Sequence, residues 1–86
     1  MNWTVYILRC ADDTLYTGIT TDLERRVVEH NSDNKKGAKY TRVRRPVTPV
    51  HQEKCDNRAH ASRREYELKK LSRVQKIRLI ECGTDT

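Results

Sequence analysis

The chain has 86 residues, of which 35% are hydrophobic and none is Phe, so it can build one small domain around a modest core. Its 18 Lys and Arg residues outnumber 12 Asp and Glu residues, and the formal net charge of +6 favours a polyanionic partner, nucleic acid before an acidic membrane surface. No apolar run approaches the roughly 20 residues that a membrane-spanning helix needs. Residues 1–4 lack the basic and apolar regions of a signal peptide. No small-molecule cofactor is evident.

Three cysteines, Cys10, Cys55 and Cys82, are widely spaced and include no C-x-x-C pair. An odd number without such a pair argues against a disulfide framework and against a zinc site. We therefore expect reduced thiols in a cytoplasmic protein.

The predicted elements begin with two strands joined by a tight turn. Residues 3–9 and 14–20 are rich in the β-branched and aromatic side chains that favour strands. Between them, Ala11-Asp12-Asp13 forms the turn.

A helix is predicted next. Thr21 and Glu24 match a capping box, in which the hydroxyl and the carboxylate satisfy free amides at the start of a helix. That helix should end near Asn31, before a polar loop at 32–37. Residues 38–42 can form one short helical turn.

The second half of the chain predicts one strand and two helices, at residues 49–55, 58–71 and 73–80. Asp56 or Asn57 can cap the first of these helices, and Ser72 can cap the second. The element order predicts an α+β fold with a small, mainly antiparallel sheet, formed by residues 1–82 and followed by a frayed tail at 83–86.

The length of the first turn decides whether two tyrosines can cooperate. A three-residue loop pairs Tyr6 with Gly18 and Leu8 with Tyr16, which puts both phenols on one sheet face as diagonal neighbours. A two-residue loop would put them on opposite faces. Tyrosines are common on half-buried sheet faces, but a glycine inside a strand often marks the close approach of a ligand or another backbone. Gly18 beside Tyr6 therefore favours a functional site.

The first helix carries an apolar stripe that ends in a histidine. Leu23, Val27 and His30 form the stripe, and Arg26 lies beside His30 on the helical wheel. A lone histidine is more often a packed or surface residue. A buried cation needs a partner or an anionic ligand, however, so Arg26 at the edge of the stripe favours function.

A later helix shows the same irregularity. Ala61, Leu68 and Leu71 form its apolar stripe, and Glu65 lies within about 60° of Leu68 by helix geometry. An isolated glutamate is usually a salt-bridged surface residue. Two helices that each point a polar group toward one sheet indicate a site where function overrides packing.

The segment 35–45 gathers six cations around a tyrosine. Such a run can be a solvated, mobile face. Basic residues with an interleaved aromatic also suit phosphate contacts combined with base or sugar stacking. The candidate nucleic-acid-binding residues are Lys35, Lys36, Lys39, Tyr40, Arg42, Arg44 and Arg45.

Five segments, in chain order, carry a family signature: T-V-Y-I-L, L-Y-T-G-I-T, L-E-R-R-V-V-E-H-N, G-A-K-Y-T-R and A-S-R-R-E-Y-E-L-K-K-L-S-R. They resemble the GIY-YIG endonuclease superfamily, specifically its small stand-alone bacterial branch, the YhbQ-like proteins. The resemblance covers about residues 3–80. The literal triplets are altered, because residues 4–6 read T-V-Y in place of G-I-Y and residues 16–18 read Y-T-G in place of Y-I-G.

The resemblance implies a three-stranded antiparallel sheet flanked by helices and a single divalent cation, with Mg²⁺ expected. Relatives in the superfamily cut DNA as homing endonucleases, restriction enzymes, the 3′-incising subunit of bacterial excision repair and resolving nucleases. The catalytic residues that it implies are Tyr6, Tyr16, Arg26, His30 and Glu65, with Glu65 as the metal ligand.

One departure from the family pattern leaves two functions open. Many members carry an asparagine beyond the helix glutamate, where this chain reads Val74-Gln75-Lys76-Ile77. Either another group such as Lys76 takes its role in a metal-dependent DNA endonuclease, or the chain is a non-catalytic nucleic-acid-binding module that retains the fold. No DNA-targeting domain accompanies the signature, so substrate selectivity stays open.

Overall fold

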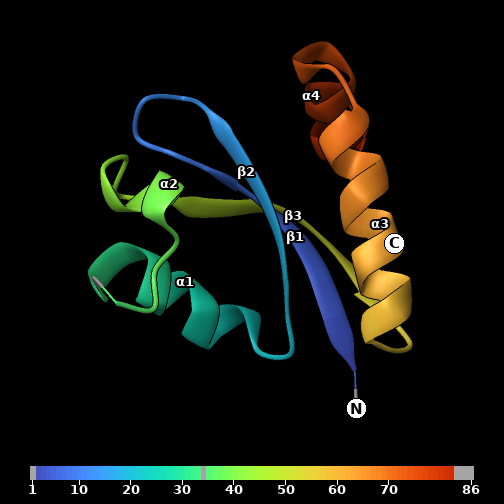
Figure 1. Cartoon of the computed structure of the whole chain (residues 1–86). Coiled ribbons are helices and arrows are strands. Elements are labelled where there is room, and N and C mark those ends of the chain that lie inside the picture. Colours follow the sequence, from blue (N-terminus) through green and yellow to red (C-terminus); the bar gives the residue numbers. More distant parts are fainter. Residues whose placement is uncertain (1, 34, 83–86) are drawn as a thin grey trace.

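A computed structural model describes residues 2–33 and 35–82. Its elements follow the order β1(Trp3–Arg9), β2(Leu15–Thr20), α1(Leu23–Ser32), α2(Lys39–Arg42), β3(Thr48–Cys55), α3(Arg58–Lys70) and α4(Arg73–Cys82) (Figure 1). The type and order of every predicted element are confirmed, with ends displaced by one or two residues. The frayed tail predicted at 83–86 lies outside the described residues.

The three strands form one antiparallel sheet with β1 in the centre and β2 and β3 at its edges. Tyr6 pairs with Gly18 and Leu8 pairs with Tyr16, which confirms the predicted register. The turn that sets it is closed by the Cys10 amide, which donates to the Thr14 carbonyl at 2.8 Å. Asp13 takes a positive φ of 70° there, a conformation that Asp tolerates better than most residues.

The register of β3 changes beside Leu8, which pairs with Pro49 while Ile7 pairs with His51. Val50 is therefore the extra residue of a bulge. Proline has no amide to donate to a ladder and is confined to edge strands and bulges. Pro49 lies on an edge strand and next to the bulge, so it costs the sheet no ladder hydrogen bond. This agrees with its predicted place at the start of an exposed strand.

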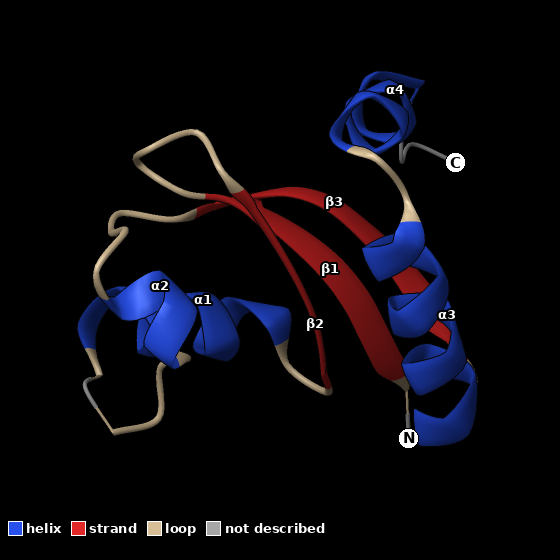
Figure 2. Ribbon diagram, turned by 45° about the horizontal axis from the view of Figure 1, so that its top comes forward, coloured by secondary structure: helices blue, strands red, loops and turns tan. Residues whose placement is uncertain are grey.

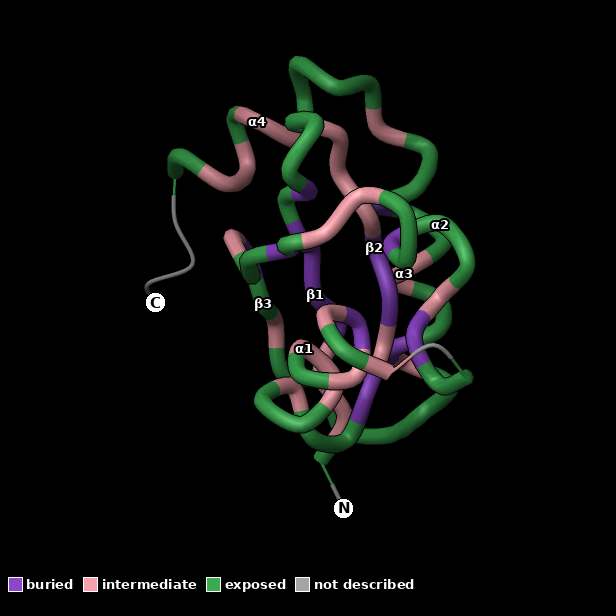
Figure 3. The backbone as a smooth tube through the Cα atoms, turned by 90° about the vertical axis from the view of Figure 1, so that its left-hand side faces the viewer, coloured by how far each residue is buried: buried purple, intermediate pink, exposed green. Residues whose placement is uncertain are grey.

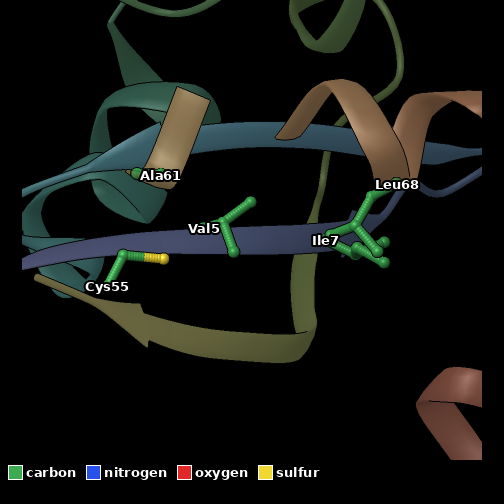
Figure 4. Close-up of a cluster of buried hydrophobic side chains, with 5 residues drawn as sticks. All are labelled: Val5, Ile7, Cys55, Ala61 and Leu68. Carbon is green, nitrogen blue, oxygen red and sulfur yellow. The ribbon is translucent and has the colours of Figure 1, made fainter. Parts of the chain in front are cut away.

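Helices cover both faces of the sheet, with α1 and α2 on one side and α3 on the other (Figure 2). Alternation along β1 divides its side chains between two cores. Val5 and Ile7 pack with Cys55, Ala61 and Leu68 beneath α3 (Figure 4).

The second core lies on the α1 face, where Tyr6 and Leu8 pack with Cys10 and Val47. Partly buried side chains of Tyr16, Leu23 and Val27 complete it. Burial follows β1 along most of its length in Figure 3. The tyrosines thus belong to the face opposite α3.

The predicted capping box at the start of α1 is wrong by one residue. Asp22, not Thr21, is the N-cap, and its Oδ1 accepts from the Arg25 amide at 3.1 Å. Thr20 supports the turn by accepting from the Asp22 amide at 3.1 Å. The side chains of Thr21 and Asp22 can both cap a helix. Because β2 ends at Thr20 and the chain then turns, Asp22 is the residue placed at the start of α1.

The caps of α3 and α4 agree with the sequence. The Asn57 side chain accepts from the His60 amide at 2.8 Å, which selects Asn57 over Asp56. At α4, Ser72 Oγ accepts from the Gln75 amide while Gln75 Oε1 accepts from the Ser72 amide. This reciprocal pair is a capping box.

Candidate active site

Tyr6 is placed by β1 and by the glycine opposite it. Its side chain is only 1% exposed, and its phenol crosses Gly18 so closely that a Cβ on Gly18 would lie 2.5 Å from the Tyr6 Oη. Such an approach is possible only with no side chain at position 18. Gly18 was expected to mark the close approach of a ligand or another backbone, and the structure corrects this: the group that approaches is the side chain of Tyr6.

His30 lies at the end of the α1 stripe and is fully buried. Its Nε2 is 3.0 Å from the Tyr6 Oη, within hydrogen-bond distance. The Tyr16 ring packs edge-on against the imidazole, with ring centroids 5.2 Å apart. Tyr6 and Tyr16 therefore face the same site, and His30 joins them.

Arg26 is held near the same site by two groups. Its Nη1 donates to Glu29 Oε1 at 3.0 Å and to the Lys36 carbonyl at 2.6 Å. Its guanidinium also acts on the Tyr6 phenol, where it opposes the rise in pKa. About a quarter of its side chain stays exposed, at 24%, so an incoming anion can still reach the charge.

The pKa values of the Tyr6–His30 pair are moved apart. Burial raises the pKa of Tyr6 to about 12, and the charges of Tyr16 and Glu65 add to the rise although Arg26 opposes it. Burial lowers the pKa of His30 to about 4, with the positive charges of Arg26 and Arg45 adding to the effect and Glu29 opposing it. At neutral pH the site thus holds a neutral phenol beside a neutral imidazole.

Glu65 lies on α3, the helix that covers the sheet face opposite the tyrosines. Its side chain is 24% exposed and pairs with Lys69 at 3.2 Å, and its negative charge acts on the Tyr6 phenol, whose pKa it raises. Tyr6 and Tyr16 thus contact His30, Arg26 lies one helical turn before it, and Glu65 acts on Tyr6 through its charge.

A metal ion would find few protein ligands here. Within residues 2–33 and 35–82, no group of three or more His, Cys, Asp or Glu side chains could hold one. Mg²⁺, however, commonly binds through one or two carboxylates together with waters and substrate phosphates. The single carboxylate of Glu65 fits that mode and does not fit a cage built from protein groups alone.

The basic segment divides into exposed and engaged cations. Lys35, Lys36, Lys39 and Arg42 are exposed. Arg45 instead turns inward, where its Nε donates to the His30 carbonyl at 2.6 Å and its Nη2 donates to the Asp33 carbonyl at 3.2 Å. Arg45 therefore holds the end of α1, and its predicted contact with nucleic acid stays a prediction.

Tyr40 connects the basic segment to the tyrosine site. Its ring stacks on Tyr16 with centroids 5.8 Å apart, and the Arg44 guanidinium lies 4.0 Å from its centroid. Arg44 also pairs with Asp12 of the β1–β2 turn at 3.1 Å. An aromatic row thus runs from His30 through Tyr16 to a 39% exposed tyrosine on α2.

Two residues of the site were missed by the sequence reasoning. Thr41 is fully buried and its Oγ1 lies 2.8 Å from His30 Nδ1, while Glu29 holds Arg26. Glu29 follows Arg26 at a helical spacing and could have been found from that pattern. Thr41 stands in a basic run without periodicity, and no sequence signal indicated its burial.

Burial of a neutral histidine should make stability depend on pH. Below about 6.5 the unfolded chain protonates His30, whereas the folded protein does so only near 4, so stability should fall as pH decreases through this window. The loss can reach roughly 3 kcal/mol. Urea unfolding of the wild type and His30→Gln between pH 7 and pH 4 measures it. The variant lacks this component, whereas carboxylate titrations are common to both proteins, and parallel pH profiles would contradict the expectation.

Comparison with known proteins assigns the chain to a family. A model of the GIY-YIG catalytic domain matches residues 2–78. A UPF0213 protein of Desulfotalea psychrophila is 57% identical over 81 residues, covering 94% of this chain and 73% of its own. Another, from Natronomonas pharaonis, is 58% identical over 80 residues, covering 93% of this chain and 92% of its own. Relatives thus occur beyond the bacterial branch that the sequence resembles.

Solved structures share the fold. The solution NMR structure of a UPF0213 protein of Bacillus halodurans has a TM-score of 0.62 and 45% identity, and covers 99% of this chain and 88% of that one. The solution NMR structure of a protein of E. faecalis has a TM-score of 0.63 and 38% identity, and the match covers 100% of this chain and 93% of that one. These similarities confirm the α+β fold. In the described part of this chain, no helix has the length and apolar character needed to cross a membrane.

Proposed function

The chain belongs to the GIY-YIG domain family, and from that premise we propose that it is a metal-dependent endonuclease that hydrolyses phosphodiester bonds in DNA. The observation that carries the proposal is the contact of Tyr6 and Tyr16 with a neutral His30 that lies within the influence of the Arg26 charge. A guanidinium suits phosphate oxygens, and a neutral imidazole suits a proton acceptor. We place this activity in the cytoplasm, where the three free thiols stay reduced.

The chemistry requires water to attack phosphorus in line with the leaving 3′-oxygen. Tyr6, with a pKa of about 12, is protonated at neutral pH and cannot itself be the resident base. Neutral His30 can accept a proton at Nε2. The water therefore gives its proton to the Tyr6 oxygen while the Tyr6 proton passes to His30, so that Tyr6 orients the water and relays its proton.

Arg26 and Tyr16 bind the phosphate in this proposal. The Arg26 guanidinium offsets the negative charge that builds on the non-bridging oxygens, an electrostatic role that is usually among the largest in catalysis. Tyr16 is the less buried of the two phenols and donates a hydrogen bond to the phosphate. Because the Arg26 charge lowers the pKa of His30, a phosphate that neutralises it raises that pKa and makes His30 a better base.

Glu65 would hold the divalent cation, for which we propose Mg²⁺. A cation held there would supply Lewis-acid chemistry, stabilising charge on a phosphate oxygen and on the leaving 3′-oxygen. Lys69, paired with Glu65 at 3.2 Å, is the group that must yield when the cation binds.

A second candidate is a non-catalytic nucleic-acid-binding module. The resemblance predicts an asparagine on the last helix, and residues 73–82 contain none. Lys76, the expected substitute, lines a small cavity with Thr14, Leu15 and Arg73. A chain without this group could keep its binding surface and lose its chemistry.

One experiment separates the two candidates. The purified protein is incubated with nicked, branched and flapped DNA, with and without Mg²⁺. We expect cleavage that requires Mg²⁺. Binding of all three substrates without cleavage would favour the binding module, and failure to bind any of them would overturn both.

Binding to DNA should depend on salt through the exposed cations of the basic segment. If Lys35, Lys36, Lys39 and Arg42 each contact a phosphate, log K should fall with log[salt] at a slope of about −3 to −4. Replacing Lys39 and Arg42 with Ala should flatten the slope by about two units. Lys54→Ala/Arg78→Ala removes the same charge from exposed positions on β3 and α4 and should leave the slope unchanged. Equal slopes for both double variants would make the segment a merely solvated surface.

A further inference from the structure

A chain of hydrogen bonds links the proposed proton acceptor to α2. His30 Nε2 lies 3.0 Å from the Tyr6 Oη, and His30 Nδ1 lies 2.8 Å from the Thr41 Oγ1. Thr41 Oγ1 in turn donates to the Ala38 carbonyl at 3.0 Å. Tyr6, His30 and Thr41 are at most 1% exposed, so these groups depend on one another for their hydrogen bonds.

The Thr41 end of this chain of hydrogen bonds sets its direction. A hydroxyl has one proton, and Thr41 gives it to the Ala38 carbonyl, which can only accept. Toward His30, Thr41 must then accept, which places the imidazole proton on Nδ1. With its proton on Nδ1, the neutral imidazole can only accept at Nε2, so the Tyr6 hydroxyl, 3.0 Å away, donates to it.

We propose that Thr41 is a positioning residue that holds His30 in the Nδ1–H tautomer and so leaves Nε2 free to accept the Tyr6 proton. The opposite tautomer would carry a proton on Nε2 and could accept nothing from Tyr6. The catalytic consequence rests on the proposed function, whereas the tautomer itself does not.

The position of Thr41 gives this contact a second role. In the single turn of α2, Thr41 points into the core while Lys39 and Arg42 are exposed. A phosphate held by either cation is therefore held by the same short helix that orients His30. Thr41 thus fixes the position of these phosphate-binding cations relative to His30, the proton acceptor.

A buried threonine can also serve packing alone, so the test needs a matched control. Thr41→Val keeps the shape and removes the hydroxyl, and Thr41→Ser keeps the hydroxyl. Thr17→Val is the control: Thr17 is also buried, and its Oγ1 has no hydrogen-bond partner among the residues that the structure describes. Val at position 17 changes packing without removing a hydrogen bond.

Histidine ¹⁵N NMR reads the tautomer directly, with the His30 signals among the three histidines assigned by their loss in His30→Gln. We expect Nδ1–H in the wild type, in Thr41→Ser and in Thr17→Val, and a shift toward Nε2–H in Thr41→Val. An Nε2–H signal in the wild type, or an unchanged tautomer in Thr41→Val, would overturn the proposal. If Thr41→Val does not fold, Thr41→Ala replaces it, and the wild-type spectrum tests the assignment without any variant.

Kinetics supply an independent readout. General-base catalysis contributes about 10²–10⁴-fold, and a partly wrong tautomer should cost a fraction of it, roughly 10-fold in kcat with KM unchanged. Thr41→Ser should restore the rate and Thr17→Val should not reduce it. Equal losses in Thr41→Ser and Thr41→Val would show a packing role only. A wild type that cuts no DNA would defeat the proposed function, and the NMR measurement would still decide the tautomer.

Discussion

Glu65→Gln should reduce cleavage at least 100-fold while leaving the fold intact. The substitution keeps size and helix propensity but removes the charge that we assign to the cation, and electrostatic groups of this kind are worth on the order of 3 kcal/mol. The fold should survive because α3 is anchored by Ala61 and Leu68, whereas the partly exposed Glu65–Lys69 pair contributes little. Metal-free DNA affinity should hold or rise, since a negative charge facing phosphate is gone.

Glu65→Gln should also change the Tyr6 pKa, and this second effect should favour activity. The Glu65 charge raises the Tyr6 pKa, so its removal lowers that pKa and eases proton transfer through the phenol. A fall in cleavage therefore reports on the cation. Glu67→Gln is the matched control, because Glu67 lies on the same helix, is 54% exposed and forms an ion pair with Arg64. Full activity in Glu65→Gln, or an equal loss in Glu67→Gln, would defeat the assignment.

Gly18→Ala should destabilise the protein by about 1–3 kcal/mol and lower cleavage by about 100-fold. The new Cβ would lie 2.5 Å from Oη and 2.7 Å from Cζ of Tyr6. Tyr6 is packed in the core and cannot yield freely, so its phenol must move away from His30. In an unstrained strand, Ala in place of Gly should instead stabilise slightly.

A double-mutant cycle isolates that contact. In a Tyr6→Phe background the Oη is absent, so Gly18→Ala should cost less there than in the wild type. Urea unfolding of the four proteins gives the coupling energy. Equal costs in both backgrounds would show that the phenol oxygen does not set the penalty at position 18.

Sequence reasoning succeeded where a local rule has a long-range consequence. The odd length of the Ala11–Asp13 turn fixes which residues face each other across the hairpin, and the alternation of strand side chains then puts Tyr6 and Tyr16 together. The helical spacing of His30 and Arg26 places both on the helix face that meets these tyrosines. The odd number of residues in one turn and the 3.6-residue period of one helix were therefore sufficient to predict that these four side chains lie near one another.

The parts that sequence reasoning missed depend on where distant segments meet. The start of α1 could not be assigned between Thr21 and Asp22 without knowing where β2 ends. Thr41 contacts a residue eleven positions earlier through a loop without periodicity. Arg45 looks like its exposed basic neighbours in the sequence, and only the fold turns it toward the carbonyls at the end of α1.

The central position of β1 has a consequence for cooperativity. Val5 and Ile7 belong to one core and Tyr6 and Leu8 to the other, so a disturbance of this strand reaches both faces of the molecule at once. In contrast, α4 contributes no fully buried side chain. Local opening should therefore begin at α4, which gives up the least buried surface when it detaches, and should leave the tyrosine site intact. Opening of β1, however, is equivalent to global unfolding, because the strand that carries Tyr6 is also the strand that holds the two halves of the protein together.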